Sequence, residues 1–194
     1  AKCDFCETSA LKSDFADMDF PEGIIPFYIT RDEAIDIFRK WVEENSSPKK
    51  AAIFLNRISE LQGYYLPHKM LRGPVDMGVG FKLESRYLPM LGYLDGIFVS
   101  ESKDLNNLVL DGAEPFDIRY LVPFDLKYMA GHKAKLPDID DEELKRRTFQ
   151  EACSYYAGVV KKILWTPSPQ MCANSARLSS VPVYLPMYIL KIGI

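Results

Sequence analysis

The sequence predicts an α+β fold with an antiparallel sheet, built from two diverged units in which a helix is followed by a strand. Three observations predict it. An apolar-Pro-Phe sequence opens a segment at 25–27 and again at 122–124. Apolar residues at helical spacing follow each time. Each helical stretch is followed by a Tyr-Leu-Pro sequence in an apolar run, at 65–67 and 184–186. The two motifs occur in the same order around a predicted helix each time, which indicates an internal duplication.

The first helix is predicted to begin after Thr30. Thr30 and Glu33 have the spacing of a capping box, in which each side chain accepts a hydrogen bond from the other residue's backbone. Apolar residues then fall on one helical stripe. They are Ala34, Ile35, Phe38, Trp41 and Val42. The polar run 45–48 is expected to end this helix, and a short amphipathic stretch is expected within 49–62.

The second helix is predicted to begin in the acidic run 138–143 and to end near Leu164, because acidic side chains favour a helix N-terminus. The same run imitates the start of a calcium-binding loop at Asp138, Asp140 and Glu142, but Glu143 stands where that loop needs glycine. The strand after this helix continues to the last residue, so we expect that more chain follows.

A β-rich insert is predicted between the units. Strands are expected over 79–85 and 86–94, and Asp95-Gly96 is a two-residue hairpin signal. A short helix or turn is expected at 103–110. The predicted parts are therefore a partial zinc-ribbon knuckle and linker at 1–23, a first unit at 24–71, the insert and connector at 72–118, and a second unit, expected to be truncated, at 119–194.

Composition excludes several classes of function. Hydrophobic residues make up 47% of the 194 residues, as in a folded globular protein. The net charge of −3 offers no basic footprint for nucleic acid. No run of about 18 apolar residues predicts a membrane span. Four cysteines are too few for a disulfide scaffold, which indicates an intracellular, reducing compartment.

A family resemblance rests on short motifs in a shared order. Residues 99–105, 114–117 and 123–124, followed by Tyr-Met-Ala-Gly-His-Lys-Ala at 128–134, resemble bacterial proteins described as transcription-factor-IIB-type zinc-ribbon-containing proteins. The resemblance implies an N-terminal zinc ribbon with two C-x-x-C knuckles before an α+β region. It implies no activity. The chain departs from the family pattern at His132, where the family has an aromatic residue.

Cys3 and Cys6 match the second knuckle of that ribbon, which gives the chain half of a zinc site at its N-terminus. Their spacing allows one loop to offer two thiolates to tetrahedral zinc, and a closed site needs two more ligands. Two interpretations stay open. The pair holds zinc together with ligands elsewhere, or it is an empty remnant. No other cofactor is predicted.

Catalytic chemistry has few candidates in this sequence. The residues 100–103 match the S-x-x-K pattern, but its companion motifs are missing. The two histidines, His68 and His132, are expected to have surface or packing roles. We therefore predict no catalytic residues and disfavour an enzyme.

The function expected from these observations is a non-catalytic interaction or scaffolding protein, such as an accessory subunit or assembly factor of a larger complex. Eleven Tyr and eleven Phe residues suit protein interfaces. The Pro-rich stretch 165–171 is predicted to contact a partner, with an ordinary linker as the alternative. The alternative function is a zinc-ribbon nucleic-acid adaptor.

Overall fold

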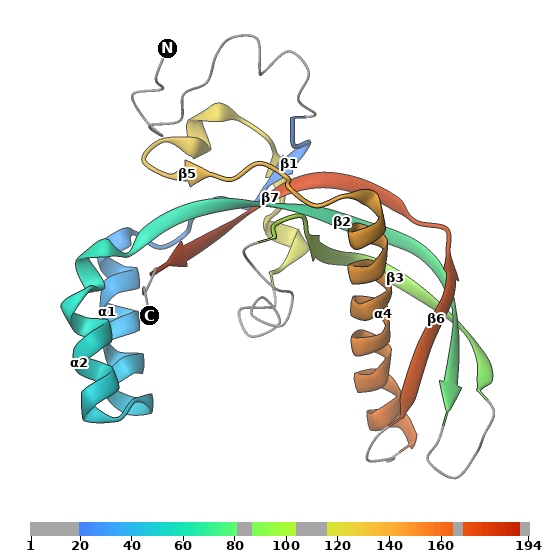
Figure 1. The fold of residues 1–194 in the computed structure, drawn as a ribbon. Helices are drawn as coiled ribbons and strands as arrows, with labels where there is room; N and C mark the ends of the chain where they lie inside the picture. Colours follow the sequence, from blue (N-terminus) through green and yellow to red (C-terminus); the bar gives the residue numbers. More distant parts are fainter. Residues whose placement is uncertain (1–19, 81–86, 104–115, 165–168, 191–194) are drawn as a thin grey trace. The chain divides into compact units, whose positions relative to one another are not determined.

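A computed structural model describes residues 20–80, 87–103, 116–164 and 169–190 of the chain (Figure 1). The chain divides into two compact units. Unit 1 consists of the described parts of Ala1–Leu66, Arg119–Leu136 and Tyr184–Ile194. Unit 2 consists of the described parts of Pro67–Ile118 and Pro137–Val183. The four predicted parts of the chain stay a prediction.

The α+β class is confirmed, with α-helices and a seven-stranded sheet in the described residues. The α-helices are α1 (Arg31–Asn45), α2 (Pro48–Asn56) and α4 (Asp141–Leu164). The strands are β1 (Gly23–Ile24), β2 (Gln62–Gly80), β3 (Leu88–Ser100), β4 (Val122–Pro123), β5 (Lys133–Ala134), β6 (Gln170–Ala176) and β7 (Ser179–Ile189). In the described part of the chain, three short 3-10 helices cover Ile58–Glu60, Ile118–Tyr120 and Leu126–Met129.

The strand order is β3-β2-β7-β1-β4, and β5 and β6 also pair with β2. The pairs β1–β4, β2–β3 and β2–β6 are antiparallel, as predicted, whereas the two-residue β5 pairs with β2 in parallel. The sheet is therefore mixed.

The start and end of α1 follow the sequence signals. The Thr30 backbone N–H donates to the Glu33 carboxylate at 2.7 Å, and the Glu33 N–H donates to the Thr30 hydroxyl at 3.3 Å, which confirms the capping box. α1 ends at Asn45, and the predicted amphipathic stretch forms α2 with Pro48 in its first turn.

The predicted hairpin at Asp95-Gly96 is wrong. β3 runs through both residues, and Leu71 pairs with Ile97 while Arg72 pairs with Asp95, so Gly96 is the extra residue of a β-bulge. Its φ of +79° explains the error, because a type I′ turn and a bulge both require a residue with positive φ. Residues 81–86 and 104–115, which include parts of the predicted strands and turn, lie outside the described residues.

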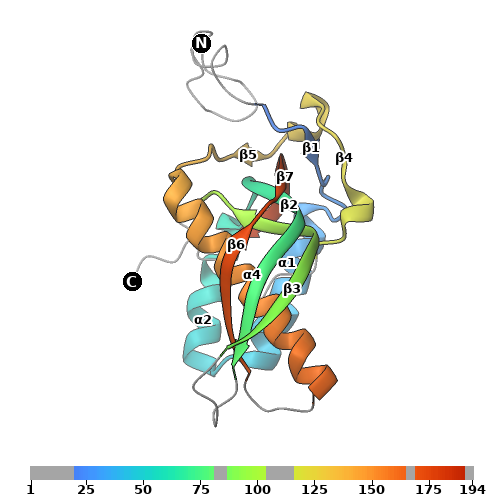
Figure 2. The ribbon, with the colours of Figure 1, turned by 90° about the vertical axis from the view of Figure 1, so that its right-hand side faces the viewer.

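The core of unit 2 lies between α4 and one face of the β3–β2–β6 sheet (Figure 2). Val75, Met77, Leu94 and Ala152 form its buried centre. Close approach of helix and sheet requires glycine at position 92, since an added Cβ would lie 2.6 Å from the Tyr156 ring.

The core of unit 1 is largely aromatic. Ile24, Tyr65 and Tyr184 are buried at its centre. Partly buried side chains pack around them, and they are Phe27, Val122, Phe124, Tyr128, Met129 and Ala134.

Candidate protein-interaction surface

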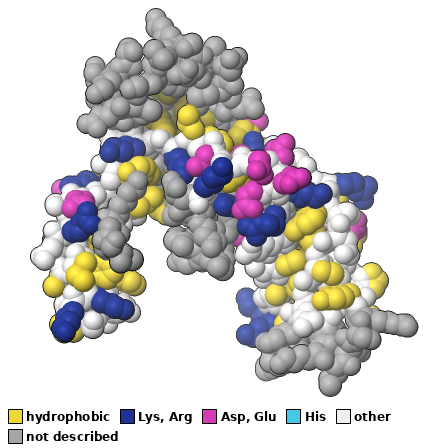
Figure 3. Space-filling model, in the orientation of Figure 1, with side chains coloured by type: hydrophobic (Ala, Val, Ile, Leu, Met, Phe, Trp, Pro, Cys, Tyr) yellow, Lys and Arg dark blue, Asp and Glu magenta, His cyan; other side chains and the backbone are white. Residues whose placement is uncertain are grey.

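The α1–α2 pair in unit 1 exposes large apolar side chains. Ile37 is 59% exposed, Trp41 53% and Ile53 54%. We call these three residues the α1–α2 surface. Ile37 and Trp41 are four residues apart, so they are neighbours on one face of α1. Figure 3 shows hydrophobic side chains on the visible face of this helix pair, with Lys and Arg side chains close by.

The predicted stripe of α1 is only partly buried. Ala34 and Val42 are buried, but Trp41, which the stripe also places in the core, is exposed. The physical reason is the width of the stripe. The stripe is broader than the face of α1 that α2 and the neighbouring 3-10 turn cover, so Trp41 at its edge stays in contact with water.

Packing beneath Trp41 supports its ring. Phe38 lies against Trp41 with ring centroids 6.2 Å apart and planes inclined by 22°. Phe38 also meets Phe54 of α2 edge-on, again at 6.2 Å. A side chain that is supported before binding loses less conformational freedom when a partner covers it.

The start of α1 is held to the rest of unit 1 by hydrogen bonds to backbone carbonyls. The Arg31 guanidinium donates to the carbonyl of Leu61 at 2.9 Å and to the carbonyl of Ser59. The Tyr188 hydroxyl donates to the carbonyl of Ile29 at 2.9 Å. The exposed side chains are therefore presented from an anchored helix.

Exposed charges of both signs border the apolar residues. Lys40 and Glu44 follow Ile37 and Trp41 by three positions each, and both are exposed. An apolar centre with a charged margin is the usual composition of a protein interface.

The predicted metal residues, Cys3 and Cys6, lie outside the described residues. Within the part of the chain that the structure describes, no group of three or more His, Cys, Asp or Glu could hold a metal ion. The half zinc site therefore stays a prediction. Residues 165–168 of the predicted contact loop also lie outside the described residues.

His132 has a packing environment. Its ring stacks on Phe27 with centroids 4.0 Å apart, and Tyr65 meets it edge-on at 5.7 Å. Its Nδ1 atom is buried without a hydrogen-bond partner. Burial lowers the pKa of His132, because the surroundings disfavour the charged imidazolium. An added Cβ at Gly63 would lie 2.4 Å from Nδ1, so glycine leaves room for the ring.

His68 belongs to unit 2 and lies opposite Ser100 in the β2–β3 pair, with both residues buried. Beside them, Lys69 approaches the buried Glu101 carboxylate at 3.8 Å. Burial raises the pKa of Glu101, and the charge of Lys69 opposes that rise. The two histidines thus belong to separate units, and His68 is buried whereas His132 is partly buried.

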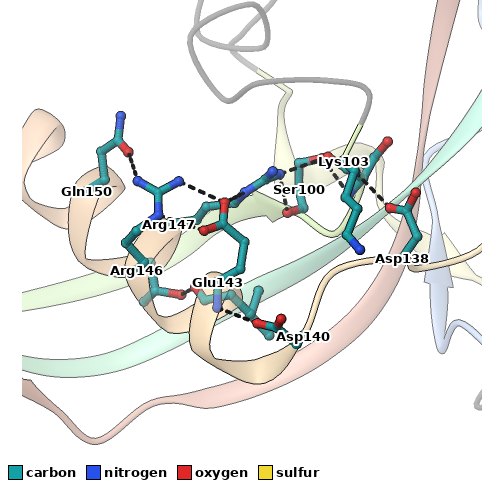
Figure 4. A network of polar contacts seen from close by, with 11 residues as sticks. Ser100, Lys103, Asp138, Asp140, Glu143, Arg146, Arg147 and Gln150 are labelled. Atoms are coloured by element: carbon teal, nitrogen blue, oxygen red, sulfur yellow. Dashed lines mark hydrogen bonds and ion pairs between the residues drawn. The ribbon is translucent and has the colours of Figure 1, made fainter.

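The 100–103 segment forms part of a polar network around the first turns of α4 (Figure 4). The buried Arg147 donates to the carbonyls of Ser100 and Ser102 at 3.1 and 2.9 Å. Glu143 accepts from both Arg147 and Arg146, which lowers its pKa to about 2. The arginines' hydrogen bonds are satisfied within the protein, as in a structural network.

Two further contacts of this network secure the start of α4. The Asp140 carboxylate accepts from the backbone N–H of Glu143 at 2.8 Å, so Asp140 caps the start of α4. Asp138 accepts from the backbone N–H of Lys103 at 2.7 Å. The hydroxyl of Ser102 is buried without a hydrogen-bond partner.

The two described cysteines are free thiols in unit 2. Cys153 packs against the core, and burial raises its pKa. A raised pKa leaves the thiol protonated and unreactive at neutral pH.

Comparison with known proteins finds a distant relative. The chain is 24% identical over 157 residues to a protein of Bacillus subtilis (strain 168) named "Uncharacterized protein YdjG". The match covers 70% of this chain and 45% of the relative, so it spans about half of the relative's length. No family model matches the chain. No solved structure matches it.

No helix among the described residues combines the length and apolar character needed to cross a membrane.

Proposed function

We propose that this chain is a non-catalytic interaction or scaffolding protein that binds another protein through the α1–α2 surface, as an accessory subunit or assembly factor of a larger complex. The observation that carries the proposal is the pair Ile37 and Trp41, exposed side by side on an anchored helix. Aromatic residues dominate the binding energy of many interfaces when a partner excludes water from them. The indicated compartment is intracellular and reducing.

Charge supports a protein partner over an anionic one. α1 carries more acidic than basic residues, and the whole chain has a net charge of −3. Helices that lie on anionic membranes or nucleic acid carry an excess of Lys and Arg. An apolar face with charges of both signs at its margin fits a protein surface better.

Native separation of an extract from the source organism tests the proposal with three forms of the chain. The wild type and Arg39→Gln are expected to migrate with a defined large assembly, whereas Trp41→Gln migrates near its own mass of 22.2 kDa. Position 39 is the matched control because it is exposed on the other side of the same helix and receives the same side chain. Migration of all three alone, or of Trp41→Gln with the assembly, contradicts the proposal.

We also propose that the chain is related to the zinc-ribbon-containing proteins and carries part of a zinc ribbon. The motif order at 99–134 and the C-x-x-C pair support this relation. Metal analysis of the purified protein tests it, with one zinc expected in the wild type and none in Cys3→Ser. If nuclease treatment disperses the assembly, the result favours the alternative function, a zinc-ribbon nucleic-acid adaptor.

A further inference from the structure

A groove in unit 2 lies between α4 and the chain around the end of β6. It has a volume of about 420 Å³. Its apolar lining comes from Leu71, Leu144, Phe149, Ala176 and Leu178. Asp141, Lys145, Thr148, Asn174 and Ser175 supply the polar lining. The groove thus combines an apolar floor with charged residues of both signs.

One side of the groove is a sheet edge. Among the described residues β6 pairs only with β2, and Figure 2 shows β6 on the side of β2 opposite to β3. The Arg177 N–H donates to the carbonyl of Pro74 on β2 at 3.0 Å. Ala176 pairs with Val75, at the next position of the β2–β6 ladder, and backbone groups along an antiparallel ladder alternate between its two sides, so the backbone groups of Ala176 point away from β2. Ala176 is one of the residues that line the groove.

The other side of the groove is one row of α4. Asp141, Lys145 and Phe149 are four residues apart, which places them one above another at intervals of about 6 Å along the helix. Alternate side chains of an extended strand repeat at about 6.6 Å. The two intervals match, so successive side chains on one face of a strand can meet successive residues of this row.

We infer that the groove binds an extended peptide segment of a partner protein, which pairs with the sheet edge at Ala176. The peptide's alternate side chains are basic, acidic and apolar, opposite Asp141, Lys145 and Phe149 respectively. Main-chain hydrogen bonds provide affinity in this mode of recognition, and the pockets for alternate side chains provide specificity. The site is separate from the α1–α2 surface and belongs to the other unit.

The opposite margin of the sheet supports this choice of edge. At β3, the Tyr156 hydroxyl of α4 already occupies the outward backbone groups of Tyr93. At β3, a hydroxyl of α4 therefore already occupies backbone groups that a peptide would need. At β6, a peptide meets the groove instead.

Selection from a displayed library of short random peptides tests the inference on the full chain. Enriched peptides are expected to carry basic, acidic and apolar residues at alternate positions. Binding is expected to shift the amide NMR signals of Ala176 and Leu178. Ala176→Pro, which removes an outward N–H, should weaken binding at least tenfold, while Leu91→Pro, which removes an outward N–H of β3, leaves it unchanged.

A second test exchanges charges between the groove and the peptide, and it does not depend on a substitution in the sheet. Lys145→Glu is exposed and should weaken binding of the selected peptide about tenfold, and exchanging the peptide's acidic residue for Lys should restore it. Lys161→Glu, exposed further along α4, is the control and should have no effect. The inference is overturned when no peptide is enriched, or when Lys145→Glu and Ala176→Pro bind like the wild type. Trp41→Gln should bind the peptide normally, which separates this site from the proposed function.

Discussion

The hydroxyl of Tyr156 on α4 holds the backbone of Tyr93 on β3 at both of its polar groups. It donates to the Tyr93 carbonyl at 2.8 Å and accepts from the Tyr93 N–H at 2.5 Å. Tyr93 lies opposite Pro74, whose carbonyl points toward Arg177, so the backbone groups of Tyr93 point away from β2. Tyr156 therefore takes the place of a further strand at this edge, which is one way to prevent unwanted pairing.

Replacing Tyr156 with Phe should destabilise unit 2 by about 1–2 kcal/mol, because two backbone groups lose their partner. Denaturant unfolding followed by circular dichroism measures the change. Tyr155→Phe is the control, since Tyr155 is exposed and its loss should change stability by less than about 0.5 kcal/mol. Equal effects of the two substitutions would contradict the capping role.

Arg147→Met should cost about 2–4 kcal/mol, because the buried carbonyls of Ser100 and Ser102 lose their donor. Arg146→Met removes a partner of the same Glu143, but the Arg146 side chain is 61% exposed where that of Arg147 is 9% exposed. It should therefore cost less than about 1 kcal/mol. Thermal and denaturant unfolding of both variants compares them, and similar losses would show that burial does not set the difference.

Thr30→Ala should destabilise α1 by about 1 kcal/mol through loss of the capping box. Ser47 precedes α2 in the same way, but its side chain makes no capping hydrogen bond. Ser47→Ala is thus a matched control with an expected change of a few tenths of a kcal/mol. Hydrogen exchange of the first-turn amides locates the effect, and unchanged exchange at Glu33 in Thr30→Ala would refute it.

His132 should make stability depend on pH. Its pKa is lowered in the folded protein, so below about pH 6.5 the unfolded chain binds a proton that the folded chain does not. This contribution is present above the unfolded pKa and is lost as the pH falls toward the folded value. The rings around it, Phe27, Tyr65 and Tyr188, carry no charge in this range.

The measurement is the free energy of unfolding of wild type and His132→Gln between pH 5 and 7.5. The wild type should lose more stability than the variant as the pH falls. Histidine NMR titration gives the pKa directly, and a value at or above 6.5 would contradict the burial argument.

Local signals predicted the parts of the fold that depend on neighbouring residues. The capping box at Thr30, the end of α1 at Asn45 and the start of α4 in the acidic run 138–143 were all predicted, because each signal lies within a few residues of the helix end. The Asp95-Gly96 error shows the limit. Whether a positive φ serves a turn or a bulge depends on β2, a partner strand more than twenty residues away.

The candidate surface shows the same limit. Periodicity placed Trp41 on the apolar stripe of α1, but only the packing of α2 decides how much of that stripe is covered. The groove was not visible in the sequence at all. Its two walls are α4 and the end of β6, and only the folded chain brings Lys145 beside Leu178.

Photocrosslinking in cells tests the central claim most directly. A benzophenone amino acid at position 41 should form an adduct with one defined protein, which after purification binds the wild type and binds Trp41→Gln at least tenfold more weakly. The same group at position 39, on the other side of α1, should form no such adduct. Adducts that are the same from both positions, or a chain that stays monomeric and uncrosslinked, would contradict a partner at the α1–α2 surface.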